Sequence, residues 1–345
     1  MRILIIGGTK FLGRHLVDAA VLRGHHVTLF NRGETAPELF PELEQIRGDR
    51  ERDLALLEGR AWDAVIDTCG YEPEVVERSV RALAGSAGQY VFISTASVYA
   101  DPTPPGADET APLEPLPPGE RDDENRGAWY GPQKALCERV VLEGFPDRAL
   151  IVRAGVLVGP HDPTDRLRYW IRRTRRGGSM LAPGSPDRAL QLIDARDLAE
   201  WIVRCVEGGV SGIYNACGPH DRLTMGVLLD AIAAATSGSA KPVWVPEEFL
   251  LRQGVEPWSE LPLWLPEADN GLMEIDLRRA FHAGLRIRLL YETLRDADDR
   301  GDEAPEPDIL PSGSPASVTL TAEREAEILA AWQAAASAGS PERDV

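Results

Sequence analysis

Two residues with complementary chemistry, Tyr130 and Lys134, lie four positions apart in the segment YGPQK. On a helix, this spacing places both side chains on one face. An ammonium beside a phenol favours the phenolate and lowers the pKa of the tyrosine, so the pair can move a proton near neutral pH. An ordinary surface pair has the same spacing, and the neighbouring motifs must therefore decide between the two interpretations.

Hydroxyl side chains precede this pair, at the end of the apolar run YVFIST and just beyond it. Ser94, Thr95 and Ser97 lie where a buried strand is expected to end. The carboxyl ends of parallel strands form the ligand-binding edge of an α/β sheet. A hydroxyl there can hydrogen-bond a substrate carbonyl oxygen as it gains charge. The alternative is that these residues only cap the strand.

The N-terminal segment GGTKFLG lies between the apolar run RILII and a stretch with helical periodicity. This order of strand, glycine turn and helix is typical of a binding site for a dinucleotide pyrophosphate. Gly7 and Gly13 suit a tight turn and close packing of helix on strand, and the N–H groups of Phe11 and Leu12 can meet the pyrophosphate. Lys10 stands where a third glycine is expected. We predict that its ammonium faces the adenosine side of the cofactor and favours NADP.

The end of the second expected strand, in LFNRGE, also bears on the choice of cofactor. An acidic residue here binds the ribose hydroxyls of NAD, whereas an arginine accommodates the 2′-phosphate of NADP. The sequence has Asn31 and Arg32 and no acid at this position. A guanidinium is permanently charged and suits a phosphate. We therefore predict NADP, with NAD as the alternative.

Short apolar runs alternate with helical patterns through the first half of the chain, which is typical of a doubly wound parallel sheet. The expected strands are residues 2–6, 27–30, 64–68, 90–95 and 149–154. The predicted fold is therefore α/β, a Rossmann-like doubly wound parallel sheet with a smaller C-terminal substrate lobe.

Four parts are predicted along the chain. Residues 1–155 form the dinucleotide-binding domain, to which parts of 190–220 return, and residues 156–295 form the substrate-binding lobe. Residues 296–318 are acidic and rich in Pro and Ser, which predicts a linker. Residues 319–345 form a C-terminal helix and tail.

The C-terminal helix is predicted from its capping residue and its apolar stripe. Thr321 suits the N-cap, and Ile328, Leu329 and Trp332 share one side of the helix. Such a stripe predicts that the helix docks on a neighbouring surface or on a partner.

The charge balance argues against polyanionic partners. Lys and Arg number 37 and Asp and Glu 55, a formal net charge of −18, which repels nucleic acid and anionic lipid. The apolar stretch from Ile3 to Ile6 is too short for a secretory signal, and no run approaches the ~18 apolar residues that a membrane span needs. The cysteines include no Cys-x-x-Cys pair, so neither a metal site nor a disulfide framework is expected. A soluble cytoplasmic protein is predicted.

In this order along the chain, GGTKFLG, STASVYA and YGPQK resemble the extended and atypical short-chain dehydrogenases/reductases, the NAD-dependent epimerase/dehydratase family. VRAGVLVGP, LIDARDLAEWI and GIYNACGP follow in the family's usual order, and the resemblance covers about residues 1–295. It implies that Tyr130 is the catalytic acid/base, and that Lys134 binds the nicotinamide ribose and depresses the pKa of the tyrosine. Thr95 takes the hydroxyl role, with Ser97 as the alternative.

The resemblance also implies a set of cofactor contacts in the glycine turn and at strand ends. Asp49 and Arg50 would contact the adenine. Thr68 and Cys69 would border the ribose and pyrophosphate, although a small buried role without redox work is the stronger interpretation for Cys69. The full set is Gly7, Thr9, Lys10, Phe11, Leu12, Gly13, Asn31, Arg32, Asp49, Arg50, Thr68, Cys69, Lys134, Ala154 and Gly155, of which the last two would lie by the nicotinamide.

Two departures from the family narrow the reaction. Sugar-nucleotide dehydratases carry an Asp-Glu pair after the hydroxyl residue, where this sequence has Ala96 and Ser97, so such a dehydration is not expected. UDP-sugar epimerases usually carry an asparagine where this sequence has Val156. The basic segment RRTRRGG (172–178) can be interpreted either as a site for a diphosphate or as a solvated helix face.

Aromatic residues in the second half of the chain are candidates for the substrate pocket. Tyr169, Trp170, Trp258 and Trp264 suit an apolar wall, with packing of the lobe as the favoured alternative for most of them. His161 is a further candidate.

The predicted function is that of an NAD(P)-dependent oxidoreductase, which transfers a hydride between the cofactor and a small carbonyl or alcohol metabolite. One alternative is a nucleotide-sugar epimerase with tightly held NAD. Another, from a different class, is a non-catalytic cofactor-sensing or RNA-binding homologue. By analogy with the family, two helices flanking the sheet would form a homodimer interface.

Overall fold

A seven-stranded sheet lies at the centre of the protein. The computed structural model describes residues 1–117, 119, 126–297 and 319–338. Every neighbouring pair of strands in the central sheet is parallel, which confirms the predicted doubly wound α/β fold. In spatial order the strands are β11 (Gly212–Ala216), β6 (Ala149–Ala154), β5 (Ala87–Thr95), β4 (Trp62–Asp67), β1 (Arg2–Ile6), β2 (His26–Asn31) and β3 (Glu44–Arg47).

The strands form where the sequence has continuous apolar runs, because both faces of a sheet covered by helices are buried. The runs RILII and ALIVRA match β1 and β6 residue for residue. Three further predicted strands overlap β2, β4 and β5, which the structure makes longer. No range was predicted for β3, because its sequence EQIR is short and mostly polar.

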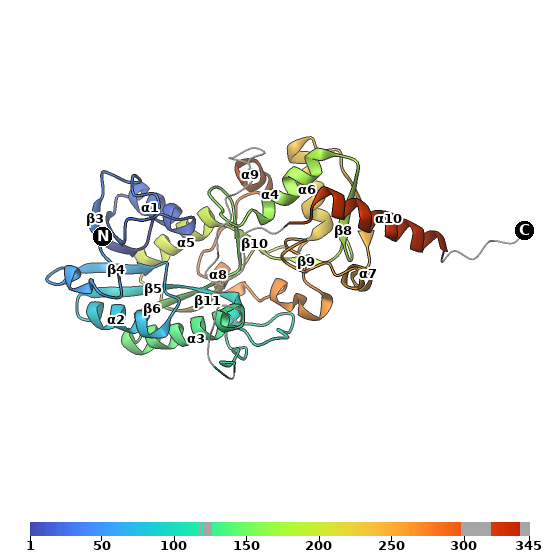
Figure 1. The fold of residues 1–345 in the computed structure, drawn as a ribbon. Helices are drawn as coiled ribbons and strands as arrows, with labels where there is room; N and C mark the ends of the chain where they lie inside the picture. The colour runs from blue at the N-terminus through green and yellow to red at the C-terminus, as the bar shows by residue number, and fades with distance from the viewer. Residues whose placement is uncertain (118, 120–125, 298–318, 339–345) are drawn as a thin grey trace, which may run out of the picture.

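Helices cover both faces of the sheet (Figure 1). On one face α1 (Leu12–Leu22) packs against α5 (Ala195–Glu207), and on the other α2 (Pro73–Leu83) packs against α3 (Arg126–Gly144). Strand β1 divides its side chains between the two layers, as the period of two in a strand requires. Ile3 and Ile5 belong to the core under α1 and α5, and Leu4 and Ile6 to the opposite core.

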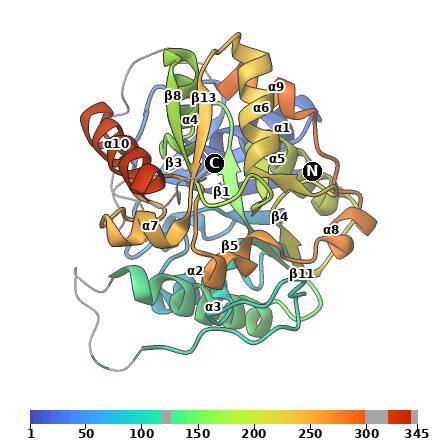
Figure 2. The same ribbon diagram turned by 90° about the vertical axis from the view of Figure 1, so that its right-hand side faces the viewer.

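A second lobe has its own apolar core, and Figure 2 turns the ribbon so that this lobe faces the viewer. In it β8 (Ser179–Pro183) pairs in parallel with β13 (Lys241–Val245), and α4 (Arg166–Arg176) packs on α6 (Met225–Thr236). The remaining elements are η1 (Leu54–Leu57), η2 (Ala96–Val98), β7 (Val156–Val158), β9 (Ala189–Leu190), β10 (Leu192–Asp194), β12 (Leu223–Thr224), α7 (Glu247–Arg252), η3 (Glu267–Met273), α8 (Arg278–His282), α9 (Leu290–Ala297) and α10 (Ala322–Ala338).

The C-terminal helix α10 docks on its own chain. The Thr321 hydroxyl accepts a hydrogen bond from the Arg324 N–H at 3.2 Å, which is the predicted N-cap. Ile328 and Leu329 are buried in the core of the second lobe, and the Trp332 ring meets Phe249 edge-on at 5.1 Å. Residues 298–318 of the expected linker and 339–345 of the expected tail lie outside the described residues. None of the helices in the described ranges is long and apolar enough to cross a membrane.

Candidate active site

The glycine turn after β1 makes a cradle that side chains would fill. Gly7 and Gly8 both have a positive φ, of 101° and 94°, a conformation that glycine adopts without steric cost. A Cβ on Gly7 would lie 2.3 Å from the Thr68 Oγ1, and one on Gly13 would lie 2.9 Å from the Gly8 Cα. The turn therefore fits the pyrophosphate of a dinucleotide at the N-terminus of α1. The need for glycine at position 8 was missed in the sequence, where Gly7 and Gly13 carried the motif.

The other residues of the turn differ from one another in how exposed they are. Thr9 and Leu12 are buried, Phe11 is half-buried, and Lys10 is exposed. The Lys10 carbonyl accepts a hydrogen bond from the Gly13 N–H at 2.9 Å, which closes the turn onto the start of α1. The middle position of the turn thus tolerates a lysine, because its side chain lies outside the close contact between Gly8 and Gly13.

The ends of β2 and β3 carry basic groups beside the turn. The Asn31 Nδ2 donates to the Gly7 carbonyl at 3.0 Å, and its Oδ1 accepts from the Gly33 N–H and from Arg47. Asn31 therefore braces the turn with its amide. Arg32 is exposed and pairs at 3.0 Å with Glu34, which is equally exposed. A surface pair of this kind is weak and readily exchanged for a ligand.

Asp49 and Arg50, both expected at the adenine, have different surroundings. Asp49 accepts hydrogen bonds from the Glu51 N–H and from Arg52, both at 2.9 Å, and these bonds lower the pKa of its carboxyl. The side chain of Arg50 points away from the surface. Its guanidinium turns inward and binds both oxygens of the buried Asp67, at 2.8 and 2.7 Å, because a buried carboxylate needs a charged partner.

The end of β4 completes the cofactor edge. The Thr68 Oγ1 donates to the Ile6 carbonyl at 2.8 Å and so links β4 to the turn after β1. Cys69 lies beside it, and burial raises the pKa of its thiol. On the other side of the site, a Cβ on Gly155 would lie 2.6 Å from the Cys217 Cα, which keeps the chain after Ala154 close to the end of β11.

The structure brings Thr95 and Tyr130 together. The Thr95 hydroxyl lies close enough to the phenol of Tyr130 to lower the pKa of that phenol. Ser97 is exposed, and its N–H donates to the Thr95 Oγ1 at 3.1 Å. Gly131 permits this arrangement, because a Cβ there would lie 1.9 Å from the Ser97 carbonyl oxygen. The glycine of YGPQK thus lets α3 approach the turn that carries the hydroxyls.

Lys134 lies one turn of α3 beyond Tyr130 and is 2 % exposed. Its Nζ donates to the carbonyl oxygens of Gly70 and Ile93 at 2.7 and 2.6 Å, and lies 4.0 Å from the centre of the Phe92 ring. Burial lowers its pKa to about 8. The side chain is thus held between the ends of β4 and β5, where the predicted cofactor site lies.

A buried ion pair lies one further turn along α3. Glu138 accepts hydrogen bonds from Arg153 on β6, the shortest at 2.8 Å, and from the Ser94 Oγ at 2.5 Å. Arg153 also donates to the Tyr99 hydroxyl at 3.1 Å. The pair ties together α3, the end of β5 and the end of β6. No role was predicted for either residue, although Glu138 follows Lys134 at helical spacing and so shares its face.

One of the groups that shift the pKa of Tyr130 was not predicted. Burial raises the pKa of its phenol, and the hydrogen bond from Thr95 and the charge of Arg166 oppose that shift. Lys134, expected to supply the opposing charge, is not among the described groups that shift the pKa, because carbonyl oxygens hold its ammonium. Arg166 begins α4 and comes from the second lobe.

Several substrate candidates from the sequence belong instead to the packing of the second lobe. Tyr169 and Trp170 are 6 % and 0 % exposed in its core, and the Trp170 Nε1 donates to the Pro262 carbonyl. Trp264 is likewise buried. Tyr169 and Trp170 thus pack in this core, which is the alternative favoured from the sequence for most of these aromatic residues. Trp258 remains half-buried.

His161 and the basic segment also differ from expectation. The His161 ring stacks on His15 of α1 at 5.8 Å. Within RRTRRGG, Arg172 pairs with Asp165 at 2.8 Å, and the buried Arg173 pairs with Glu325 of α10 at 2.8 Å. Because carboxylates already engage these two arginines, neither the diphosphate site nor the solvated face describes them.

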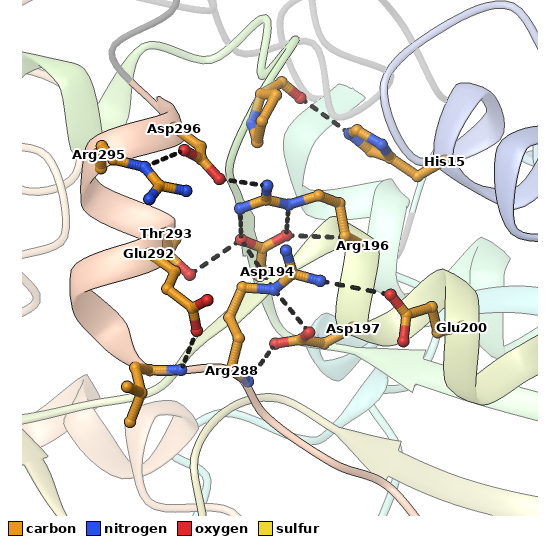
Figure 3. A network of polar contacts seen from close by, with 12 residues as sticks. His15, Asp194, Arg196, Asp197, Glu200, Arg288, Glu292, Thr293, Arg295 and Asp296 are labelled. Atoms are coloured by element: carbon orange, nitrogen blue, oxygen red, sulfur yellow. Dashed lines mark hydrogen bonds and ion pairs between the residues drawn. The ribbon is translucent and has the colours of Figure 1, made fainter.

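A polar network joins the two halves of the protein at the start of α5 (Figure 3). The Asp194 carboxylate caps α5 by accepting from the Arg196 N–H at 2.9 Å, and it accepts from Thr293 of α9 at 2.9 Å. Arg196 also donates to Asp296 at 2.6 Å. Burial alone would raise the pKa of Asp194, but the hydrogen bonds from Arg196 and the charge of Arg288 lower it. Nowhere in the described ranges do three or more His, Cys, Asp or Glu side chains group as metal ligands.

The comparisons with known proteins agree with this geometry. Residues 3–217 match the model of the NAD dependent epimerase/dehydratase family. A solved UDP-glucuronic acid 4-epimerase from Bacillus cereus in complex with NAD has the same fold, with a TM-score of 0.63 and 18% identity, over 87% of this chain and 98% of that one.

Two curated relatives differ in what their names describe. The chloroplast stem-loop binding protein of 41 kDa b from Arabidopsis thaliana is 28% identical over 269 residues, 72% of this chain and 67% of that protein. The 2′-dehydrokanamycin reductase from Streptomyces kanamyceticus is 25% identical over 291 residues, 79% of this chain and 78% of the reductase. The family match covers more than half of this chain. Together with the site described above, it shows that the chain belongs to the NAD-dependent epimerase/dehydratase family and is an NAD(P)-dependent enzyme of the kind that family contains.

Proposed function

We propose that this protein is an NADP-dependent reductase or dehydrogenase that acts on a small carbonyl or alcohol metabolite. The observation that carries the proposal is the close approach of the Thr95 hydroxyl to the Tyr130 phenol, at the sheet edge that also holds the glycine turn. The name of the reductase from Streptomyces kanamyceticus supports a redox reaction. The Ala96 and Ser97 that stand in place of an Asp-Glu pair argue against sugar dehydration.

The residues divide the chemistry as follows. The nicotinamide cofactor, when bound, supplies or accepts the hydride. Thr95 holds the substrate oxygen by a hydrogen bond, and Tyr130 gives that oxygen a proton on reduction or removes one on oxidation. Lys134 holds a ribose hydroxyl of the cofactor with its ammonium, which lies between the ends of β4 and β5.

The preference for NADP rests on two basic residues. Arg32 stands where NAD enzymes carry an acid, and its pairing with Glu34 is weak because both side chains are about two-thirds exposed. Lys10 occupies the exposed middle of the turn. Both lie on the adenosine side of the proposed cofactor site, where a 2′-phosphate adds negative charge. Asn31 cannot replace the missing acid, since its amide already braces the Gly7 carbonyl.

Cofactor binding and turnover test this proposal together. We expect purified protein to bind NADPH more tightly than NADH, and Lys10→Gly and Arg32→Met each to weaken NADPH binding about tenfold while changing NADH binding little. Tyr130→Phe should keep the dissociation constant for NADPH and lower carbonyl reduction about 100-fold or more. Unchanged turnover in Tyr130→Phe would contradict the assigned role.

A second candidate function, a nucleotide-sugar epimerase, is favoured by the named structure with NAD bound. Such an enzyme keeps its cofactor through the cycle, so denatured protein would release NAD. We expect denatured protein to release little nucleotide. NAD released in stoichiometric amount would favour the epimerase.

The proposed partners are a small-molecule substrate and a second copy of the chain. The name of the Arabidopsis thaliana relative describes stem-loop binding, yet a net charge of −18 opposes contact with a phosphate backbone, so we propose no nucleic-acid partner. The adjacent helices α2 and α3 are the proposed homodimer surface. Sedimentation equilibrium and a mobility-shift assay with a stem-loop RNA check the two statements.

A further inference from the structure

Arg166 differs from the other arginines of α4 in the charged groups that lie near its side chain. Asp165, with a left-handed φ of 60°, pairs with Arg168 at 3.4 Å and with Arg172 at 2.8 Å. Arg173 pairs with Glu325. Arg166, the first residue of the helix, instead has Tyr130 and Asp162 as its electrostatic neighbours. Arg166 is thus a cation of the second lobe within electrostatic reach of Tyr130.

The Arg166 guanidinium lies over an aromatic ring. Its central carbon lies 4.8 Å from the centre of the half-buried Trp258 ring. Contact with a ring leaves the N–H groups of a guanidinium able to bind the two oxygens of an oxyanion. Among the residues that the structure describes, no hydrogen bond or ion pair engages these N–H groups.

Asp162 lies near this group as its counter-charge. Its carboxylate is 4 % exposed and accepts from the Thr164 N–H at 2.8 Å within its own loop. Arg166 and Asp162 interact by charge, and no direct bond between them is found among the described residues. Asp162 thus balances part of the charge of Arg166 and leaves the guanidinium edge to a ligand.

We propose that Arg166 is a specificity-determining residue, which binds a carboxylate or phosphate group of the substrate beside Tyr130. The inference rests on the proposed function, because it takes Tyr130 as the group that meets the reacting oxygen. A protein with a net charge of −18 repels anions at long range. An anionic substrate therefore needs a local cation such as Arg166 for its recognition.

Chemical labelling tests the site without any turnover. Phenylglyoxal modifies accessible arginines, and mass spectrometry of the full chain with NADPH gives the rate at each one. We expect malonate or inorganic phosphate to slow labelling of Arg166 about fivefold or more. Slowing by malonate alone would identify a carboxylate as the ligand, and slowing by phosphate alone would identify a phosphate. Arg252 is the matched control, because it lies over the Phe249 ring of the same lobe at 5.9 Å. No slowing at Arg166, or equal slowing at Arg252, would overturn the proposal.

A kinetic comparison tests specificity. In pairs of carbonyl compounds that differ only in a free carboxylate or its methyl ester, Arg166→Met should lower kcat/KM for the acid about tenfold or more and leave the ester unchanged. Arg166→Lys should restore part of the loss, and Arg252→Met should change neither. Equal losses for acid and ester would overturn the proposal. If the unaltered protein reduces neither compound, the proposed reductase function fails, while the labelling still decides whether Arg166 binds an oxyanion.

Discussion

Lys134 holds a positive charge in largely apolar surroundings, over the Phe92 ring. Burial lowers its pKa from 10.5 to about 8, against the opposing charges of Asp67 and Glu138. We expect kcat/KM to fall as the pH rises through about 8, because the neutral amine is a weaker hydrogen-bond donor to the ribose hydroxyl of the cofactor. A pH profile of carbonyl reduction measures this fall.

The free energy of unfolding should change in the opposite direction over the same range. Between pH 8 and 10.5 the unfolded chain keeps the Lys134 proton and the folded protein does not, so this group makes folding more favourable as the pH rises. Lys134→Arg stays charged and should abolish both the fall in kcat/KM and this part of the pH dependence of unfolding. If the fall persists at the same pH in that variant, another group causes it.

At the scale of elements, the contact between α5 and α9 depends on Asp194 (Figure 3). Its carboxylate, 1 % exposed, pairs with Arg196 and Arg288 and accepts from Thr293. Asp194→Asn keeps the shape but removes the buried carboxylate that Arg196 and Arg288 share, while Arg196 keeps Asp296 and Arg288 keeps Asp197. We expect it to lower the free energy of unfolding by about 2–4 kcal/mol and to speed amide exchange in α9. Urea unfolding and hydrogen exchange measure the two effects.

Glu200 gives a control from the same network. It lies 3.6 Å from Arg288, but its side chain is 56% exposed. Glu200→Gln should change the free energy of unfolding by less than about 1 kcal/mol, because an exposed pair is screened by water. Equal effects of the two variants would show that Asp194 does not hold α9.

At the scale of the whole molecule, α10 packs on the second lobe. Its residues contact side chains that lie far from them in the sequence. Glu325 is buried, binds Arg173 and accepts from the Leu181 N–H at 2.9 Å. Glu325→Gln should lower the unfolding free energy of this lobe by about 3 kcal/mol, because it leaves a buried guanidinium unpaired. Thermal unfolding followed by tryptophan fluorescence measures the loss, since Trp170 and Trp264 belong to this core.

Glu327, on the same helix, is 71% exposed and pairs only loosely with Arg324, at 3.8 Å. Glu327→Gln should leave the unfolding midpoint unchanged within a degree or two, as an exposed pair contributes little. A midpoint for Glu325→Gln that equals that of Glu327→Gln would mean that α10 is held by its apolar stripe alone.

The sequence by itself determined the elements and the local motifs. RILII and ALIVRA predicted β1 and β6 because an apolar run between turns has few alternatives to a buried strand. The spacing of YGPQK placed Tyr130 and Lys134 on one helix, and Thr321 predicted the start of α10. These signals lie within a few residues of the structure they produce.

Only the tertiary structure decided the partners of the charged and aromatic residues. The side chain of Arg50 binds Asp67, and that of Arg173 binds Glu325, 152 positions away. Arg166 opposes the raised pKa of Tyr130 although it comes from the other lobe. A side chain exerts its charge on whatever the fold brings near it, and a burial preference alone does not distinguish a core tyrosine from one that lines a pocket. The glycine turn was recognisable from its residues, whereas the cation that acts on Tyr130 was not.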